Sequence, residues 1–279
     1  MTSRADSRAI PGTKYGRWAV VTGASDGIGR AFAGRLAEAG FNLVIAARRE
    51  KILEHLAEDL ASRHHIDVRP VACDLATPEG AALLETSTAE LDVGLLVASA
   101  GFGTSGPFLA AELRSELEMI DVNCRAVAQL VFTFGNRFVR RGGGGLVLLS
   151  SLVAFQGVPR AANYAATKAY VQTFAEGLRE ELKGQGVEVL AVAPGPVRSG
   201  FGERANMRMG RAQTPAQVAS GALRALGKRG TVRPGFLAQF LELALKPLPR
   251  WGRVRMMGVV MSGMTRHQPH PVSLTRGAP

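Results

Sequence analysis

The chain alternates between short apolar runs and segments in which apolar residues recur at helical spacing, and this alternation strongly limits its fold. Six runs are almost continuously apolar, at residues 18–22, 42–47, 68–73, 93–99, 146–150 and 187–193. Between them, apolar residues recur every three or four positions, which is typical of amphipathic helices. Strands that are apolar on both faces are buried on both faces, so the pattern predicts a doubly wound parallel sheet with helices on both sides.

The length and composition favour one large α/β domain. The chain has 279 residues, of which 46% are hydrophobic, and no low-complexity linker or internal repeat divides its middle. We therefore expect a loosely ordered tail at 1–16, a cofactor-binding and catalytic domain at 17–234, a helical extension at 235–265 and a disordered tail at 266–279.

The net charge of +11 raises the question of an anionic partner. No helix-turn-helix, zinc-finger or RNA-binding sheet signature is present, so nucleic-acid binding is not expected. An anionic cofactor, an acidic lipid surface or an acidic thioester substrate fits the same charge. Cys73 and Cys124 match no metal spacing, and no metal site is predicted. The polar N-terminal stretch lacks the apolar core of a secretion signal, so we expect a cytoplasmic protein.

A glycine-rich turn lies between the first apolar run and the first helical segment. Its glycines, Gly23, Gly27 and Gly29, are spaced GxxxGxG. Such a turn lets backbone N–H groups at a helix N-terminus approach a pyrophosphate without side chains in between. A purely structural turn is the alternative, but the strand, turn and helix context favours dinucleotide binding.

A second chemical feature is the pair Tyr164 and Lys168, four residues apart in a predicted helix over 161–183. Their side chains project from one helix face, so the ammonium group can lower the pKa of the phenol toward neutrality for proton transfer. Ser151 ends the preceding apolar run and can reach the same substrate oxygen. The alternative is an ordinary exposed pair on a helix surface.

Several motifs occur together in one order: TGASDGIG at 22–29, CDL at 73–75, Asn123 in DVNCRA, SS at 150–151, YAATK at 164–168 and PGPVRS at 194–199. In this combination the chain resembles the short-chain dehydrogenase/reductase family from about residue 17 to residue 230. The resemblance implies a Rossmann-type fold and a nicotinamide cofactor. It also implies a homodimer or homotetramer formed through the long helices on either side of Ser151.

The resemblance assigns roles to four catalytic residues. Tyr164 is the proton donor or acceptor, and Ser151 hydrogen-bonds the carbonyl oxygen. Lys168 depresses the pKa of Tyr164 and holds the nicotinamide ribose. Asn123 anchors a water that passes protons to Lys168, although an Asn within a helix can also be a solvated or capping residue.

The second apolar run ends in Arg48 and Arg49 without a carboxylate. A carboxylate at this place selects NAD, whereas guanidinium groups bind a 2′-phosphate, so NADP(H) is favoured over NAD(H). Solvated arginines are the alternative. By resemblance Asp74 contacts the adenine, with a turn carboxylate as the alternative. The predicted cofactor-binding residues are Gly23, Ser25, Asp26, Gly27, Ile28, Gly29, Arg48, Arg49, Asp74, Leu75, Ala100, Gly101, Tyr164, Lys168, Pro194, Gly195, Val197 and Ser199.

The sequence departs from the family pattern at two places. Ala98 and Ser99 stand where many members have two Asn residues, which leaves open how that strand end is braced. Ser199 stands where Thr is usual and still offers a hydroxyl to the nicotinamide carboxamide.

Substrate recognition is expected in residues 201–213, which include Met207 and Met209, with apolar walls from Phe102, Phe155 and Val158. The extension at 235–265 combines an apolar helical stripe with Trp251 and several basic residues. It predicts a helix that covers the pocket or lies at a subunit interface, or a peripheral contact with a membrane.

Together these features predict an NADP(H)-dependent oxidoreductase that interconverts a carbonyl and a secondary alcohol on a hydrophobic small molecule, such as a fatty-acyl or steroid-like compound. The alternative from another class is an NADPH-binding regulator or scaffold without turnover.

Overall fold

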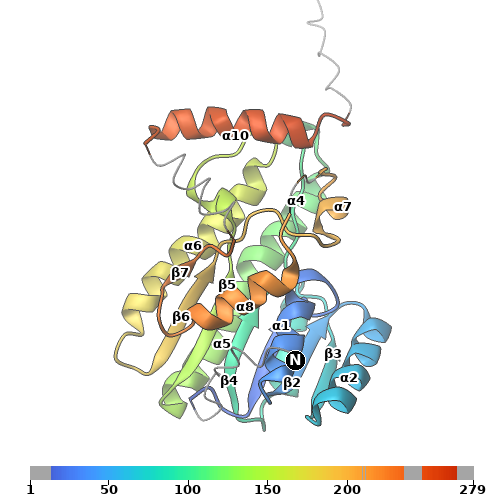
Figure 1. Cartoon of the computed structure of the whole chain (residues 1–279), viewed down its shortest axis with the longest axis vertical. Helices are drawn as coiled ribbons and strands as arrows, with labels where there is room; N and C mark the ends of the chain where they lie inside the picture. The colour runs from blue at the N-terminus through green and yellow to red at the C-terminus, as the bar shows by residue number, and fades with distance from the viewer. Residues whose placement is uncertain (1–13, 209, 211, 236–246, 269–279) are drawn as a thin grey trace, which may run out of the picture.

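The computed structural model of the chain describes residues 14–208, 210, 212–235 and 247–268. One parallel sheet forms its centre, with the strand order β3-β2-β1-β4-β5-β6-β7 (Figure 1). The strands are β1 (Trp18–Thr22), β2 (Asn42–Ala47), β3 (Val68–Ala72), β4 (Val93–Ala98), β5 (Gly144–Leu149), β6 (Val187–Val192) and β7 (Thr231–Val232). The predicted doubly wound parallel sheet is confirmed.

Successive strand residues pack into two different cores. Ala19 and Val21 of β1 lie in a cluster with α1 (Gly27–Glu38), α2 (Glu50–His64) and α8 (Pro215–Ala225). Trp18 and Val20 lie in the other cluster, with α3 (Pro78–Ser87), α5 (Ala126–Arg141) and α6 (Ala162–Glu181). Because both faces of the sheet are covered, the strands read as continuous apolar runs.

The sheet has one strand more than the six that the sequence predicts. β7 consists of Thr231 and Val232, which pair with Ala191 and Val192 of β6. Two residues are too few to show an apolar run, so no sequence pattern indicated this strand.

The long helical segment between β4 and β5 contains an irregular turn. α4 (Leu113–Ile120) continues through a π-helical segment, η2 (Asp121–Arg125), into α5. The wider turn places Asn123 in the interior, where its exposed fraction is 0%. Such turns commonly occur at functional sites.

The packed chain extends beyond both predicted tail boundaries. Tyr15 is buried and donates its hydroxyl hydrogen bond to Glu188. At the other end, Gln268 is buried and donates to Ser105 Oγ at 2.7 Å and to Asn206 O at 2.8 Å. These polar contacts between distant segments leave no trace in a local sequence pattern.

The last described helix, α10 (Arg250–Met264), lies across one end of the molecule, apart from the sheet (Figure 1). Residues 236–246, where the sequence predicts an apolar stripe, lie outside the described residues. Within the described part of the chain, no helix is long and apolar enough to cross a membrane.

Candidate active site

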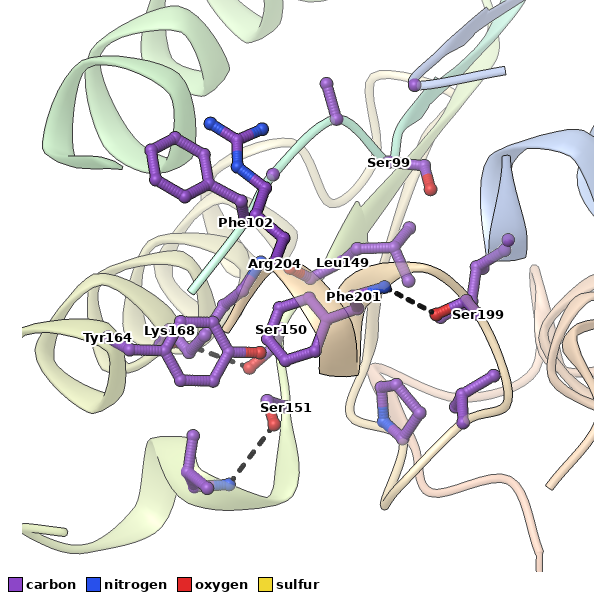
Figure 2. Close-up of a pocket in the computed structure, with 18 of the residues that line it drawn as sticks. Ser99, Phe102, Leu149, Ser150, Ser151, Tyr164, Lys168, Ser199, Phe201 and Arg204 are labelled. Carbon is purple, nitrogen blue, oxygen red and sulfur yellow. Dashed lines mark hydrogen bonds between the residues drawn. The ribbon is translucent and has the colours of Figure 1, made fainter. Parts of the chain in front are cut away.

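The carboxyl ends of β1, β4, β5 and β6 open onto one cavity of about 800 Å³. It lies where the chain order in the sheet changes direction, because β1 pairs with β2 on one side and with β4 on the other. Crevices of this kind bind ligands in open α/β sheets. Figure 2 shows Ser99 after β4, Leu149 and Ser151 at the end of β5, and Ser199 in the loop after β6 around this space.

The glycine turn requires its glycines. Gly23 has φ +67°, and a Cβ on it would lie 2.9 Å from Ala100 N. Gly27 has φ +54°, with Ser199 Cβ 2.9 Å from the same hypothetical atom. A Cβ on Gly29 would lie 2.3 Å from Gly23 O. The turn is therefore close to the two loops across the cavity and is tightly folded on itself.

The N-terminus of α1 points its amides at this cavity. Asp26 precedes the helix but makes no side-chain capping bond; its Oδ2 instead accepts from Gly200 N at 3.0 Å. The first N–H groups of α1 are thus left for an anion, and a pyrophosphate is the anion that such a turn suits. The lining residues fit a dinucleotide at this end of the cavity.

The side chain of Thr22 braces the end of β4. Its Oγ1 accepts hydrogen bonds from Ser99 N and Ala100 N, both at 3.0 Å. The side chain of Ser99 is not needed for this brace. The available signal was the hydroxyl residue directly before Gly23 in the neighbouring strand.

The predicted catalytic residues Ser151, Tyr164 and Lys168 line the same part of the cavity (Figure 2). Ser151 precedes the short helix η3 (Leu152–Phe155), and its Oγ accepts from Val153 N at 3.4 Å. Tyr164 and Lys168 come from the buried face of α6. Lys168 Nζ donates to Leu149 O at 2.8 Å, which ties α6 to the end of β5.

Burial shifts the pKa values of both Tyr164 and Lys168. It raises the pKa of Tyr164 to about 12, although the hydrogen bond with Ser151 lowers it. Burial also lowers the pKa of Lys168 to about 8. The expectation that Lys168 brings the pKa of Tyr164 toward neutrality is therefore corrected: Lys168 Nζ lies 5.9 Å from the ring centroid and donates to Leu149 instead.

Asn123 lies behind the cavity wall rather than in it. Its Oδ1 accepts from Phe102 N at 3.1 Å, and its Nδ2 donates to Phe102 O at 2.9 Å and to Thr167 Oγ1 at 3.0 Å. The side chain amide thus joins the loop after β4 to α6. A Cβ on Gly101 would lie 2.8 Å from Asn123 Oδ1, which explains why that loop has glycine here.

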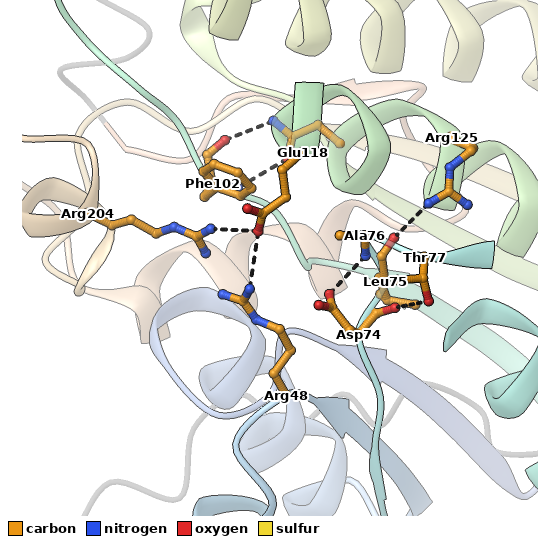
Figure 3. Close-up of polar contacts among 10 residues, drawn as sticks. Arg48, Asp74, Leu75, Ala76, Thr77, Phe102, Glu118, Arg125 and Arg204 are labelled. Atoms are coloured by element: carbon orange, nitrogen blue, oxygen red, sulfur yellow. Dashed lines mark hydrogen bonds and ion pairs between the residues drawn. The ribbon is translucent and has the colours of Figure 1, made fainter. Parts of the chain in front are cut away.

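Figure 3 shows polar contacts at the cofactor end of the cavity, where Arg48, Asp74 and Arg204 line it. Arg48 and Arg204 both donate to Glu118 Oε1, each at 3.2 Å. Asp74 Oδ1 accepts from Ala76 N at 3.0 Å, so this carboxylate also closes a turn, as its alternative interpretation expected.

Arg49 approaches the glycine turn from the start of α2. Its Nη2 donates to Ser25 Oγ at 3.0 Å. Arg49 therefore lies beside the turn, whereas Arg48 bonds to Glu118 on α4.

The remaining predicted cofactor residues also line the cavity, namely Ile28, Leu75, Pro194, Gly195 and Val197.

The apolar wall comes partly from segments that the sequence indicates and partly from α10. Phe102, Phe155, Phe201 and Met207 line the cavity, whereas Val158 is buried in the core beside Tyr164. Met209 lies outside the described residues.

Helix α10 forms another wall of the cavity, with Arg253, Met257, Val260, Met261 and Met264. A helix that covers the pocket was one of the alternatives for residues 235–265. Arg233, which follows β7, places its guanidinium group 4.3 Å from the centroid of the Phe155 ring. The available signal for an apolar segment here was the Val and Met content of residues 254–264. Among the described residues, no group of three or more His, Cys, Asp or Glu side chains could hold a metal ion.

Known proteins share both the sequence pattern and the fold. The chain is 33% identical over 186 residues to very-long-chain 3-oxoacyl-CoA reductase-A of Danio rerio, covering 65% of this chain and 58% of that protein. The chain thus spans less than two thirds of that relative. It is 31% identical over 182 residues to a 7beta-hydroxysteroid dehydrogenase of Clostridium sardiniense, covering 65% of this chain and 70% of that protein.

Solved structures of other proteins share the fold of this chain. A 7beta-hydroxysteroid dehydrogenase superimposes with a TM-score of 0.82 at 25% identity, over 88% of this chain and 98% of that one. A short-chain dehydrogenase from Sphingobium yanoikuyae in complex with NADPH gives 0.74 at 28% identity, over 91% and 98%. The sequence profile of the family described as short chain dehydrogenase matches residues 17–209. The Rossmann-type chain therefore belongs to the short-chain dehydrogenase family of oxidoreductases, as its motifs predicted.

Proposed function

We propose that the protein interconverts a carbonyl and a secondary alcohol on a hydrophobic small molecule, using NADP(H). The observation that carries this proposal is the meeting of Ser151, Tyr164 and Lys168 in one cavity with a glycine turn suited to a dinucleotide. A protein that only binds the cofactor has no use for a buried phenol and hydroxyl at this place.

The protonation states support Tyr164 as the acid in reduction. With a pKa of about 12, the phenol keeps its proton near pH 7 and can donate it to a carbonyl oxygen. The Ser151 hydroxyl donates to the same oxygen and polarises the carbonyl group. Lys168, whose Nζ donates to Leu149 O, lines the same part of the cavity. Bound NADPH supplies the hydride.

Arginine side chains support the preference for NADP(H). Arg48 and Arg49 line the cavity beyond β2, where an NAD-selective site has a carboxylate. Guanidinium groups bind phosphate through paired hydrogen bonds, and Ser25 lies within bonding distance of Arg49. A related structure of this fold contains NADPH, which agrees with this preference.

The lining supports a hydrophobic substrate of steroid or acyl type. Met207 of the loop after β6 and Met257, Met261 and Met264 of α10 line the cavity, and flexible thioether side chains adapt to bulky apolar ligands. The two curated relatives described above are named for a hydroxysteroid and a 3-oxoacyl-CoA.

We also propose a homodimer or homotetramer. Phe132 of α5 is 76% exposed and Tyr170 of α6 is 41% exposed, so these two helices present apolar side chains to a partner copy. A cytoplasmic location stays a prediction.

The test combines cofactor binding with turnover. NADPH and NADH are titrated against the wild type and Arg48→Ala, and NADPH oxidation is then followed with a panel of hydrophobic ketones and 3-oxoacyl thioesters. We expect tighter NADPH binding, loss of that preference in Arg48→Ala, and turnover with at least one compound. Failure of both cofactors to bind would overturn the proposal. Binding of NADPH without turnover of any compound would favour the regulator alternative.

A further inference from the structure

One carboxylate oxygen connects the cofactor end of the cavity with the loop after β6. Glu118 Oε1, on α4, accepts from Arg48 Nη1 and from Arg204 Nη2, each at 3.2 Å (Figure 3). Arg48 follows β2, and Arg204 ends the short helix α7 (Phe201–Arg204). Three segments far apart in the sequence thus meet at a single acceptor atom.

Two guanidinium groups and two carboxylates gather at this meeting point, since the charge of Asp74 also acts on Arg204. Two guanidinium groups share one carboxylate, and their side chains remain 50% and 41% exposed, so an anion in solution can reach both. The guanidinium group of Arg204 lies 3.5 Å from the centroid of the Phe102 ring, which holds it in place. Burial and the charge of Arg48 both lower the pKa of Arg204, a sign that the two cations are close.

We propose that Arg204 is a further specificity-determining residue for the phosphate-bearing cofactor, and that the Glu118 carboxylate occupies the position that the 2′-phosphate takes between Arg48 and Arg204. The inference rests on the proposed use of NADP(H). A phosphate offers more acceptor oxygens and more negative charge than a carboxylate, so it satisfies two guanidinium groups better. Glu118 keeps both arginines in position until the phosphate replaces it.

Replacement of the Glu118 carboxylate by a phosphate at Arg204 also affects the part of the cavity where Tyr164 lies. Phe201 begins the same four-residue helix, and its ring centroid lies 5.3 Å from that of Tyr164. A phosphate that holds Arg204 therefore also holds Phe201 against the proton donor. NADP(H), unlike NAD(H), would close the loop over the substrate as it binds.

A purely structural role for Glu118 predicts the opposite change in nucleotide affinity when Glu118 is replaced. If Glu118 serves only to close the loop, its removal loosens α7 and weakens nucleotide binding. If it competes with the phosphate, its removal strengthens binding of nucleotides that carry a 2′-phosphate and leaves the others unchanged.

The experiment measures binding of 2′,5′-ADP and of 5′-ADP by calorimetry, so that neither the nicotinamide nor turnover enters the result. For Glu118→Gln we expect 2′,5′-ADP to bind about 3- to 10-fold more tightly, since two exposed ion pairs no longer compete. For Arg204→Gln we expect it to bind about 10-fold more weakly, because one charge-assisted contact is lost. Binding of 5′-ADP should stay unchanged in both variants, which also shows that they fold.

Glu112→Gln is the matched control, because Glu112 is an exposed carboxylate that precedes α4 and makes no side-chain capping bond. It should change neither affinity. A second measurement is hydrogen exchange in residues 201–208, which 2′,5′-ADP should slow in the wild type but not in Arg204→Gln.

Weaker or unchanged binding of 2′,5′-ADP to Glu118→Gln would overturn the inference while leaving the NADP(H) preference intact. Equal affinity of the wild type for the two nucleotides would overturn the proposed preference itself, and the inference with it.

Discussion

Replacement of Lys168 by Met should stabilise the protein at neutral pH while removing a group that we propose to be catalytic. Burial lowers the pKa of Lys168 from 10.5 to about 8, a difference that corresponds to about 3 kcal/mol between the charged and neutral forms. Met lacks the charge, but it also lacks the hydrogen bond that Lys168 donates to Leu149 O at 2.8 Å, which costs about 1 kcal/mol. The free energy of unfolding should therefore rise by about 2 kcal/mol at pH 7.

The same pKa determines how the free energy of unfolding changes with pH. Between the folded value of about 8 and the unfolded value of 10.5, the unfolded chain binds more protons than the folded one. The wild type thus gains stability as pH rises through this window, whereas Lys168→Met does not gain it. The advantage of the variant should fall to about zero near pH 10.

Urea unfolding of both proteins at pH 7 and pH 10 measures this difference. Lys183→Met is the control, because the Lys183 side chain is 78% exposed and its removal should change neither value appreciably. Equal stability differences between the wild type and Lys168→Met at the two pH values would refute the reasoning that burial depresses this pKa.

Three further perturbations have clear expected results. Gly29→Ala places a Cβ 2.3 Å from Gly23 O, so the turn must move and nucleotide affinity, measured by calorimetry, should fall at least 10-fold. Thr22→Val removes the acceptor of two backbone N–H groups and should lower the free energy of unfolding by about 2 kcal/mol in urea titrations. If α10 contacts membranes, the protein should float with anionic vesicles at low salt, and Trp251→Ala should reduce the bound fraction, because Trp251 is 67% exposed beside basic residues.

Each of these has a control and a contradicting outcome. Gly34→Ala, on the same helix with nothing within 4 Å of its Cβ, should leave binding intact, and equal behaviour of the two Ala variants would contradict the crowded-turn argument. Thr22→Ser keeps the hydroxyl and should retain most of the stability; a loss as large as that of Thr22→Val would point to packing instead. Protein that stays soluble with anionic vesicles at low salt would dismiss membrane contact through α10.

The sequence predicts the sheet and much of the cavity because parallel strands end at one edge. Gly23, Ser151 and Pro194 each follow an apolar run, so the topology brings them together without knowledge of any side-chain contact. The four-residue spacing of Tyr164 and Lys168 likewise fixes their shared helix face. These inferences depend on local periodicity, which a single sequence displays.

The features of the fold and the site that the sequence did not predict depend on contacts between residues far apart in the chain. Nothing local indicates that Glu118 meets Arg48, 70 positions earlier, or that the π-helical turn carries Asn123 inward. The direction of the Tyr164 pKa was mispredicted for the same reason. Spacing reveals a neighbouring ammonium group, but the burial that outweighs its effect becomes visible only once the core is assembled.

The proposed function depends on Tyr164 transferring a proton to the carbonyl oxygen of a hydrophobic substrate. The direct measurement compares the rate of NADPH oxidation by the wild type and by Tyr164→Phe, with the best compound of the ketone and thioester panel, after equal NADPH affinity has been shown. Tyr164→Phe should lower kcat at least about 100-fold, the usual contribution of a positioned general acid. A Tyr164→Phe enzyme that keeps wild-type turnover would show that Tyr164 is not the proton donor.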